Sequence, residues 1–334
     1  MTSSKHLNIS DIQVGAYIEG VYSLVNPQTA VTRAGKPYFK GIIRDASGEA
    51  TVRKWTFEEA ALPLVSATGY ARIAGRVENY NGQIQVVIES IEAVEVSTED
   101  LVALLPATTK NIDEMFAAVR DLLQSMRDPA MRALADSYLL DEAMMGAFRH
   151  APAATNIHHA WIGGLLEHTH QLMQLAERML PLYPQLNRDL VLMGLFLHDL
   201  GKTVELEWEK GFNYTRDGQL IGHLVRGAIW LQLKAALAAK ASGHRLSPET
   251  VVVLQHIILS HHGQLEHGSA KLPATPEAIF VALLDNLEAK TTVAIHAAAR
   301  ERLHAGNAEF TERVWSLDTR IYRPDPLSHA SAQA

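Results

Sequence analysis

The chain contains no cysteine among its 334 residues. This absence excludes disulfide scaffolds, thiolate zinc sites, iron–sulfur clusters and cysteine nucleophiles. No apolar run approaches the roughly 18 residues of a membrane-spanning helix, and residues 1–6 lack the apolar segment of a secretion signal. We therefore expect a cytoplasmic protein that does not act at a membrane.

An excess of basic residues is also absent. The chain has 30 Lys and Arg against 37 Asp and Glu, a net charge of −7, so it is not a general basic coat for nucleic acid. Its 47% hydrophobic content is that of a globular protein and excludes a disordered polyelectrolyte. At roughly 150 residues per domain, the length suggests about two domains.

The first 95 residues contain five segments with the pattern of strands, at 14–22, 38–45, 50–55, 70–78 and 83–91. Asn26-Pro27 to Gly35 predicts a turn-rich loop, and Asn81-Gly82 predicts a tight hairpin turn. A short helix is expected at 57–65, between the third and fourth strands. This order is that of an OB-fold β-barrel, which we predict for residues 1–95.

From Ser97 onward the hydrophobic pattern has a helical period, interrupted by prolines and glycines, as far as about Leu303. We predict a helical connector at 96–155, an all-α domain at 156–321 and a flexible tail at 322–334. The fold class is therefore an α+β multidomain protein, with an N-terminal five-stranded OB-fold β-barrel followed by an all-α domain.

The sharpest local motif is Leu197-His198-Asp199-Leu200-Gly201-Lys202, which follows a long apolar run. An ionisable pair at the end of such a run is costly unless a bound cation compensates it. His198 can hold one metal ion while the two oxygens of Asp199 bridge to a second. Lys202 shares that helix face and suits a phosphate oxygen. The alternative is a plain helix end, with Gly201 as its cap and Lys202 complementing the helix dipole.

Histidine is the other unusual feature, because 12 of the 16 histidines lie between His150 and His267. Taken singly, each histidine at a helix end is better explained as a cap, and a carboxylate within a helix as a salt-bridge partner. Together the candidates form an order on five helices that is more specific than any member, given as His168, His198, Asp199, His223, His261, His262 and Asp285.

This order resembles the HD-domain phosphohydrolase superfamily, and within it the YhaM-type 3′→5′ exoribonucleases, in which an OB-fold precedes an HD domain. The matching stretches cover nearly the whole chain, at 152–154, 158–160, 163–169, 197–202, 218–223, 258–263, 276–287 and 310–313. Two departures are Thr155, where many relatives carry lysine, and Ala270, where proline is usual. The first would weaken a substrate contact, and the second is minor.

The resemblance implies two divalent metal ions, with manganese favoured and iron, zinc or magnesium as alternatives. His168, His198, Asp199 and Asp285 would hold the first ion, and Asp199, His223 and His261 the second. His262 would be a further ligand or lie behind one. Two such ions generate a hydroxide for attack on phosphorus. Lys202 would stabilise the added negative charge, and His158 or His159 would donate a proton or contact a phosphate.

The barrel offers a single-strand binding surface. Residues 33–54 carry six basic and two acidic side chains, a net charge of +4, and aromatic residues lie among them. The candidate contacts are Lys36, Tyr38, Lys40, Arg44, Arg53 and Trp55. Phe39 and Tyr80 are further stacking candidates, although about half of the aromatics should lie in the core because strand neighbours face opposite ways. The alternative is a structural barrel with solvated charges.

The sequence therefore predicts a hydrolase, a metal-dependent 3′→5′ exoribonuclease acting on single-stranded RNA, with single-stranded DNA as a further substrate and nucleoside 5′-monophosphates as products. Direction and product rest on the resemblance. One alternative is an HD phosphohydrolase of small nucleotides, and another is a non-catalytic single-strand binding protein. The sequence leaves the oligomeric state open, including a homo-oligomer.

Overall fold

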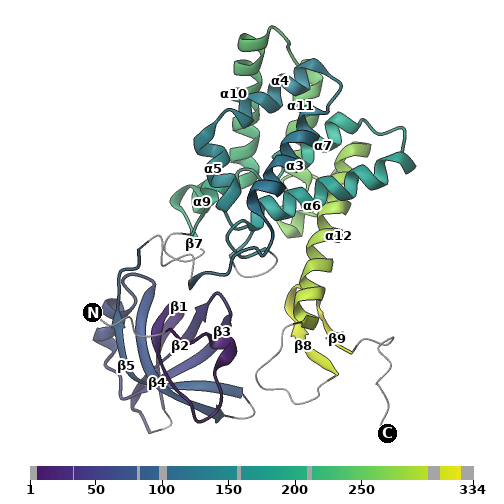
Figure 1. The fold of residues 1–334 in the computed structure, drawn as a ribbon. Helices are drawn as coiled ribbons and strands as arrows, with labels where there is room; N and C mark the ends of the chain where they lie inside the picture. Colours follow the sequence, from purple (N-terminus) through teal and green to yellow (C-terminus); the bar gives the residue numbers. More distant parts are fainter. Residues whose placement is uncertain are drawn as a thin grey trace, which may run out of the picture. The chain divides into compact units, whose positions relative to one another are not determined.

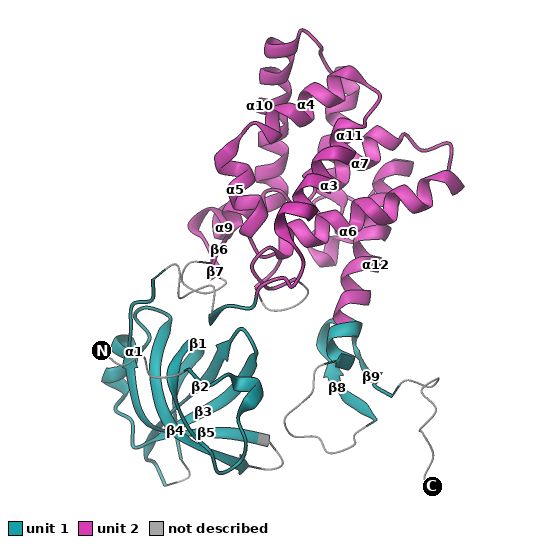
Figure 2. Ribbon diagram, in the orientation of Figure 1, with its two compact units in different colours: residues 1–106, 209–211, 294–334 teal, residues 107–208, 212–293 magenta. Residues whose placement is uncertain are grey.

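The computed structural model describes residues 6–32, 34–80, 83–97, 104–155, 159–208, 213–299 and 309–324. It divides into two compact units, which Figure 2 distinguishes by colour. The first unit comprises residues 1–106, 209–211 and 294–334, and the second comprises residues 107–208 and 212–293. The first unit contains a β-barrel and the second is mainly helical (Figure 1).

The barrel has five strands and closes in the order β1-β2-β3-β5-β4. Its strands are β1 (Tyr17–Val31), β2 (Pro37–Asp45), β3 (Gly48–Trp55), β4 (Tyr70–Tyr80) and β5 (Gln83–Ala93). Strands β3 and β5 pair in parallel and the other neighbours pair antiparallel. A short helix, α1 (Leu62–Val65), lies between β3 and β4. This topology is an OB-fold, so the prediction for the N-terminal domain is confirmed.

The loop expected from Asn26 to Gly35 is mostly strand, which corrects the sequence prediction. Strand β1 continues to Val31, and its pairing with β2 shifts between Val25 and Gln28. Asn26 has a φ of 49°, a conformation that asparagine tolerates, and Pro27 has no N–H to donate. Both residues therefore fit a β-bulge, which bends the strand without ending it. The turn residues Asn81 and Gly82 lie outside the described residues, but β4 and β5 pair up to Tyr80 and Gln83.

The helical unit is built from helices of 4 to 24 residues, most of which begin at a side-chain cap. Asn111 caps the first of them, and its Oδ1 accepts hydrogen bonds from the backbone N–H of Asp113 and Glu114. The helices are α3 (Ile112–Gln124), α4 (Pro129–Leu139), α5 (Glu142–His150), α6 (Gly164–Met179), α7 (Arg188–Leu197), α8 (Lys202–Glu205), α9 (Arg216–Leu220), α10 (His223–Ser242), α11 (Pro248–Ser260) and α12 (Pro276–Ala299). Two short antiparallel strands of two residues each, β6 (Leu206–Glu207) and β7 (Asn213–Tyr214), lie between α8 and α9.

The boundary expected between residues 155 and 156 does not separate two packed units. Val119 of α3, Leu134 of α4 and Phe148 of α5 are fully buried in the same core as Leu165 of α6 and Val191 of α7. The segment predicted as a connector therefore forms part of the helical core, because its apolar stripe packs against the later helices.

The helical domain expected to extend to residue 321 also ends differently. Residues 310–322 form a hairpin, β8 (Phe310–Val314) and β9 (Thr319–Tyr322), in which Phe310 pairs with Tyr322. Tyr322, expected to begin a flexible tail, is thus the last residue of a strand, and residues 325–334 lie outside the described residues. Within the described ranges, no helix combines the length and apolar character that a membrane crossing requires.

Candidate metal centre and nucleic-acid surface

The centre of the helical unit is the end of α7. Asn187 caps this helix by accepting hydrogen bonds from the backbone N–H of Asp189 and Leu190. The following residues, from Val191 to Leu197, are almost completely buried. This apolar helix carries His198 and Asp199 into the core, where they are 0% and 3% exposed. Two ionisable groups at such a depth require compensating partners.

Asp199 faces a different pair of histidines with each of its carboxylate oxygens. Its Oδ2 lies 3.8 Å from His168 Nε2 and 3.5 Å from His198 Nε2. Its Oδ1 lies 3.5 Å from His223 Nε2 and 3.4 Å from His261 Nε2. One carboxylate thus connects two groups of imidazoles contributed by α6, the turn after α7, the start of α10 and the end of α11.

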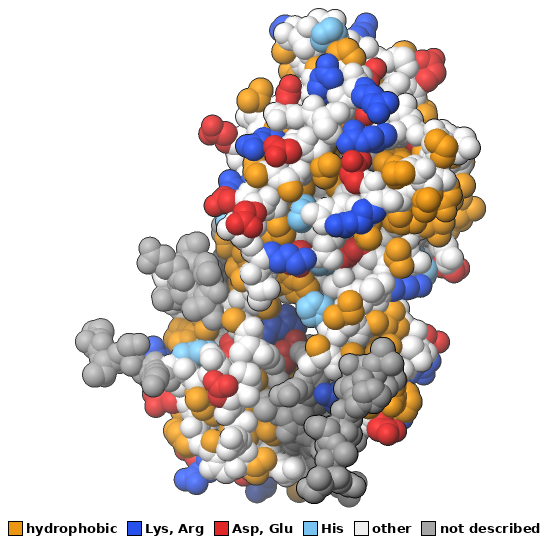
Figure 3. Space-filling view, turned by 45° about the vertical axis from the view of Figure 1, so that its right-hand side comes forward, with side chains coloured by type: hydrophobic (Ala, Val, Ile, Leu, Met, Phe, Trp, Pro, Cys, Tyr) orange, Lys and Arg blue, Asp and Glu red, His pale blue; other side chains and the backbone are white. Residues whose placement is uncertain are grey.

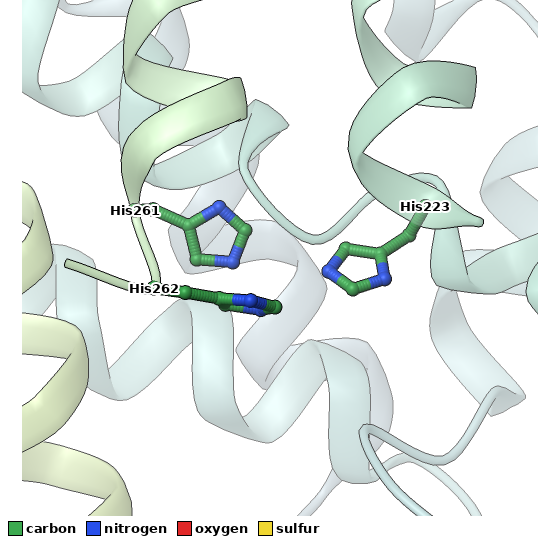
Figure 4. A group of neighbouring side chains, drawn as sticks. All are labelled: His223, His261 and His262. Atoms are coloured by element: carbon green, nitrogen blue, oxygen red, sulfur yellow. The ribbon is translucent and has the colours of Figure 1, made fainter. Parts of the chain in front are cut away.

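Two further predicted ligands join these groups. Asp285 of α12 places Oδ1 3.2 Å from His168 Nε2, on the Oδ2 side of Asp199. On the other side His262 joins His223 and His261, and all three ligand nitrogens lie within 4.8 Å of one another. Figure 4 shows these three rings, with the two from the end of α11 facing the one from the start of α10. The structure therefore brings together all seven residues predicted as metal ligands.

The four histidines around Asp199 all point Nε2 at it. The Nδ1 atom of each ring lies close to an oxygen atom elsewhere. His198 Nδ1 lies 2.7 Å from the carbonyl oxygen of Leu195, and His261 Nδ1 lies 2.9 Å from that of Ile258. The other two Nδ1 atoms lie close to carboxylates: His168 Nδ1 forms a hydrogen bond of 2.6 Å with Glu288, whereas His223 Nδ1 lies 2.8 Å from Glu205 Oε2 without the alignment of a hydrogen bond. An Nδ1–H that donates to oxygen leaves the Nε2 lone pair free for a metal ion.

Glu288 and Glu205 were not predicted as site residues. Glu288 follows Asp285 by one helical turn, and that spacing on a helix bearing a candidate ligand was the available signal. Glu205 follows Lys202 by three residues within the same short helix α8. Neither spacing distinguishes a buried partner from a solvated surface carboxylate, so only the fold could identify them.

Gly201 has a specific role in the motif. A Cβ at this position would lie 2.4 Å from the carbonyl oxygen of His223, a clash with backbone that cannot move aside. The backbone of Gly201 is right-handed, with φ −60°, so it is not a left-handed helix cap. The glycine lets the start of α10 approach α7, which positions His223 beside Asp199. The alternative of a plain capped helix end therefore does not describe this turn.

The charges of the centre are strongly perturbed. Burial would raise the pKa of Asp199, but the Lys202 ammonium, 2.7 Å from Oδ2, and His198 hold it well below its usual value. Burial lowers the pKa of His198 to about 4 and that of His262 to about 3, so both rings are neutral near pH 7. Burial would also lower the pKa of His168, but Asp285 and Glu288 raise it to about 10. The centre therefore favours a positive charge among its carboxylates.

The donor set fits divalent metal ions. The Nε2 atoms of His168 and His198 lie 3.3 Å apart. Among the described residues, Asp199 Oδ1, both ring nitrogens of His223 and His262 Nδ1 are buried without a hydrogen-bond partner. Buried acceptors that converge without donors are costly, and a cation between them removes that cost. Mixed imidazole and carboxylate ligands suit manganese, iron or zinc better than a site made only of oxygens.

The predicted catalytic residues are placed differently from one another. Lys202 lies beside the centre through its contact with Asp199. His159 is buried, and its Nε2 lies 2.8 Å from Glu288, so it stands behind His168 rather than at an open face. This placement does not support a direct contact between His159 and a phosphate. His158 lies outside the described residues.

The barrel carries a cluster of exposed aromatic side chains around one arginine. Tyr38 and Trp55 are cross-strand neighbours with ring centroids 5.2 Å apart. The guanidinium of Arg53 lies 5.9 Å from each of these ring centroids and 4.9 Å from that of Tyr80. Trp55 and Tyr80 are about half exposed, whereas Phe39 is fully buried, as the alternation of strands requires.

The basic candidates divide into two kinds. Lys36 and Lys40 are exposed, and Lys40 pairs across strands with Arg53, beside the aromatic cluster. Arg44 is largely buried and forms an ion pair with Glu49, with Nη2 2.6 Å from Oε1. Its charge is therefore already compensated, which makes it the weakest of the predicted contacts. On the face of the helical unit seen in Figure 3, basic side chains are interspersed with acidic and hydrophobic ones.

The comparisons with known proteins agree with this architecture. Residues 165–290 match the HD domain family model. The chain is 33% identical over 319 residues to 3′-5′ exoribonuclease YhaM from Geobacillus sp. (strain WCH70), covering 93% of each chain. The second OB-fold domain of replication protein A from Methanococcus maripaludis has 16% identity and a TM-score of 0.22, over 28% of this chain and 97% of that domain. The OB-fold assignment rests on the strand order of the barrel.

A centre of histidines and carboxylates within an HD domain defines the chain as a hydrolase of the metal-dependent HD class. The similarity over almost the full length of both chains is more specific than the domain alone. The chain belongs to the YhaM family of exoribonucleases.

Proposed function

We propose that this protein is a metal-dependent 3′→5′ exoribonuclease that degrades single-stranded RNA to nucleoside 5′-monophosphates, with single-stranded DNA as a further substrate. The observation that carries the proposal is the position of Asp199, whose two oxygens face two separate groups of histidines. A single bridging carboxylate is the arrangement that holds two metal ions within reach of one phosphate.

We assign His168, His198 and Asp285 to one metal ion and His223, His261 and His262 to the other, with Asp199 shared. When bound, such ions lower the pKa of a water molecule and neutralise charge on the scissile phosphate. Manganese is our preferred metal for this donor set, and the protein is expected to act in the cytoplasm.

The surrounding side chains have distinct tasks in this mechanism. Lys202 holds Asp199 as a carboxylate and adds a positive charge beside the position of the phosphate. Asp199, held deprotonated by this contact, keeps the negative charge that lets both oxygens act as ligands. The buried walls of the centre exclude bulk water, which strengthens each of these interactions.

The barrel would bind the strand that the helical unit cuts. Tyr38, Trp55 and Tyr80 offer faces on which bases stack, and such stacking accepts any base sequence. Arg53, Lys36 and Lys40 add positive charge for the phosphate backbone. The direction of degradation is supported by the relative described as a 3′-5′ exoribonuclease.

The test is the degradation of a 5′-labelled single-stranded RNA by the purified protein, with and without manganese. We expect a metal-dependent ladder that shortens from the 3′ end. The Asp199→Asn variant, which keeps the side-chain shape, should give no ladder. Glu167→Gln is the matched control, because Glu167 is also buried but contacts Trp161 and Lys110 instead of the centre.

Two outcomes would overturn the proposal. Intact RNA in the presence of bound manganese, with hydrolysis of small nucleotides, would identify a nucleotide phosphohydrolase. Tight RNA binding that survives Asp199→Asn, without turnover by the unaltered protein on either substrate, would identify a binding protein whose metals are structural.

A further inference from the structure

The histidines of the centre are held in two different ways. On each side of Asp199, one histidine directs Nδ1 to the backbone carbonyl three residues earlier, at 2.7 Å for His198 and 2.9 Å for His261. The other histidine directs Nδ1 to a carboxylate, which is Glu288 for His168 and Glu205 for His223. The backbone carbonyl is fixed by the turn to which the histidine belongs. The carboxylate belongs to a side chain, which a substitution can replace.

Helix α12 contacts both ring nitrogens of His168, through Asp285 and Glu288. One turn of this helix carries Asp285, whose Oδ1 is 3.2 Å from Nε2, and the next carries Glu288, whose Oε2 is 2.6 Å from Nδ1. The other oxygen of Glu288 accepts hydrogen bonds from Gln171 and Thr292 and lies 2.8 Å from His159 Nε2. The carboxylate is only 3% exposed, so these contacts fix its orientation.

Glu205 holds His223 at two points. Its Oε1 accepts a hydrogen bond from the backbone N–H of His223, at 3.2 Å, and its Oε2 lies 2.8 Å from Nδ1 of the same residue. The first contact caps the start of α10. The second places a carboxylate oxygen beside the ring nitrogen, without the alignment of a hydrogen bond. Glu205 ends the short helix α8 that begins at Lys202, and this turn places it beside the start of α10.

We propose that Glu288 and Glu205 are positioning residues, each of which sets the metal affinity of one of the two sites through a single histidine. Glu288 acts on the site of His168, His198 and Asp285, and Glu205 acts on the site of His223, His261 and His262. The inference rests on the proposed two-metal centre. A carboxylate on Nδ1–H fixes the tautomer and ring orientation and makes Nε2 a stronger ligand.

The competing explanation is that both glutamates only stabilise the fold. Glu167 separates the two explanations, because it precedes His168 in the chain, is similarly buried and engages Trp161 and Lys110 rather than a candidate ligand. Glu167→Gln therefore reports the effect of removing a buried carboxylate charge from this region without touching a histidine of the centre.

The experiment is a titration of the full-length, metal-free protein with Co²⁺, followed by visible absorption and by calorimetry. Wild type and Glu167→Gln should each bind two ions. Glu288→Gln should weaken one site by about 10- to 100-fold and Glu205→Gln should weaken the other by a similar factor. Unchanged affinities in both variants would overturn the inference.

Repeating the titration in the His223→Ala variant tests whether each glutamate acts through its own histidine. In His223→Ala, the change Glu205→Gln should have no further effect on cobalt binding, because its histidine is gone, whereas Glu288→Gln should still weaken the remaining site. A further loss from Glu205→Gln equal to that in wild type would show that it acts elsewhere and would overturn its assignment.

The outcomes separate a failure of the proposed metal centre from a failure of the positioning role. A wild-type protein that binds no cobalt would contradict the proposed metal centre, whereas two intact sites in every glutamate variant would contradict only the positioning role. Thermal unfolding identifies variants that fail to fold. If Glu288→Gln is one of these, Glu288→Asp and the less embedded Glu205→Gln carry the test, with the same expected losses.

Discussion

The two units place their candidate functional residues in opposite environments. In the helical unit, His198, Asp199 and His261 are almost completely buried, and each has partners that fix its orientation. In the barrel, Trp55 and Tyr80 are about half exposed, and the guanidinium of Arg53 lies near both of their rings. The first arrangement suits chemistry at one fixed atom, and the second suits binding a ligand of variable sequence.

This contrast predicts how substitutions should act. In the centre, a change of one atom alters a charge balance that water cannot restore, so effects should be large and fall on turnover. On the barrel surface each side chain contributes one contact among several, so effects should be moderate and fall on affinity. The following predictions test that division.

The largest effect is expected for Asp199→Asn. The amide cannot serve both groups of histidines as a carboxylate does, so turnover should fall by at least about a thousandfold, or roughly 4 kcal/mol of activation free energy. The measurement is single-turnover cleavage of a labelled RNA. Binding of the same RNA to the variant should be unchanged. A parallel loss of binding would contradict the assignment of turnover to the centre and of affinity to the barrel.

Removal of metal should abolish cleavage and lower the stability of the helical unit. An ion present at 100 times its dissociation constant stabilises a folded protein by about 2.7 kcal/mol per site. We therefore expect a lower melting temperature after dialysis against a chelator, reversed by added manganese. Thermal unfolding of Asp199→Asn supplies the control, because manganese should raise its melting temperature far less.

The metal-free protein should lose stability on both sides of about pH 6.5. The folded-state pKa of His198 is about 4, below its ordinary 6.5, so the unfolded chain takes up the proton first as the pH falls. Its contribution, up to roughly 3 kcal/mol, is complete above pH 6.5 and is lost toward pH 4. The pKa of His168, about 10, acts in the opposite sense, because its contribution is lost as the pH rises toward 10.

Denaturant unfolding of the chelated protein at several pH values measures this dependence. His168→Gln should remove the alkaline loss and retain the acid one. A stability that stays constant between pH 4 and pH 10 would contradict the burial and the contacts assigned to both histidines.

The smallest effect is expected for Trp55→Ala. Loss of one stacking surface should cost about 1 to 3 kcal/mol in binding of single-stranded RNA, a change of about 5- to 150-fold in the dissociation constant. Turnover at saturating RNA should be unaffected. Phe39→Ala is the informative contrast, because that ring is buried and its loss should cost about 3 to 5 kcal/mol of stability instead.

The sequence predicts the ligands of the centre better than their supports. His198 and Asp199 follow an apolar run and stand out because ionisable residues there are costly, and their order with the other histidines is specific. Glu288 and Glu205 belong to helices in which a glutamate is an ordinary surface residue. Only the packing of α12 against α6, and of α8 against α10, gives these carboxylates their histidine partners.

The fold shows the same limit. Alternation of apolar residues and turn signals predicts the five strands of the barrel and their OB-fold order. The bulge at Asn26 is not predicted, because asparagine followed by proline usually marks a turn and the pairing of β1 with β2 across it is a tertiary effect. Likewise, the helical period at 112–150 predicts helices but not the core into which they pack.

The most direct test of the central claim is an anomalous-scattering map from crystals of the protein grown with manganese. We predict two peaks flanking Asp199, one beside His168, His198 and Asp285 and the other beside His223 and His261. A single peak, or manganese bound away from Asp199, would contradict the two-metal centre.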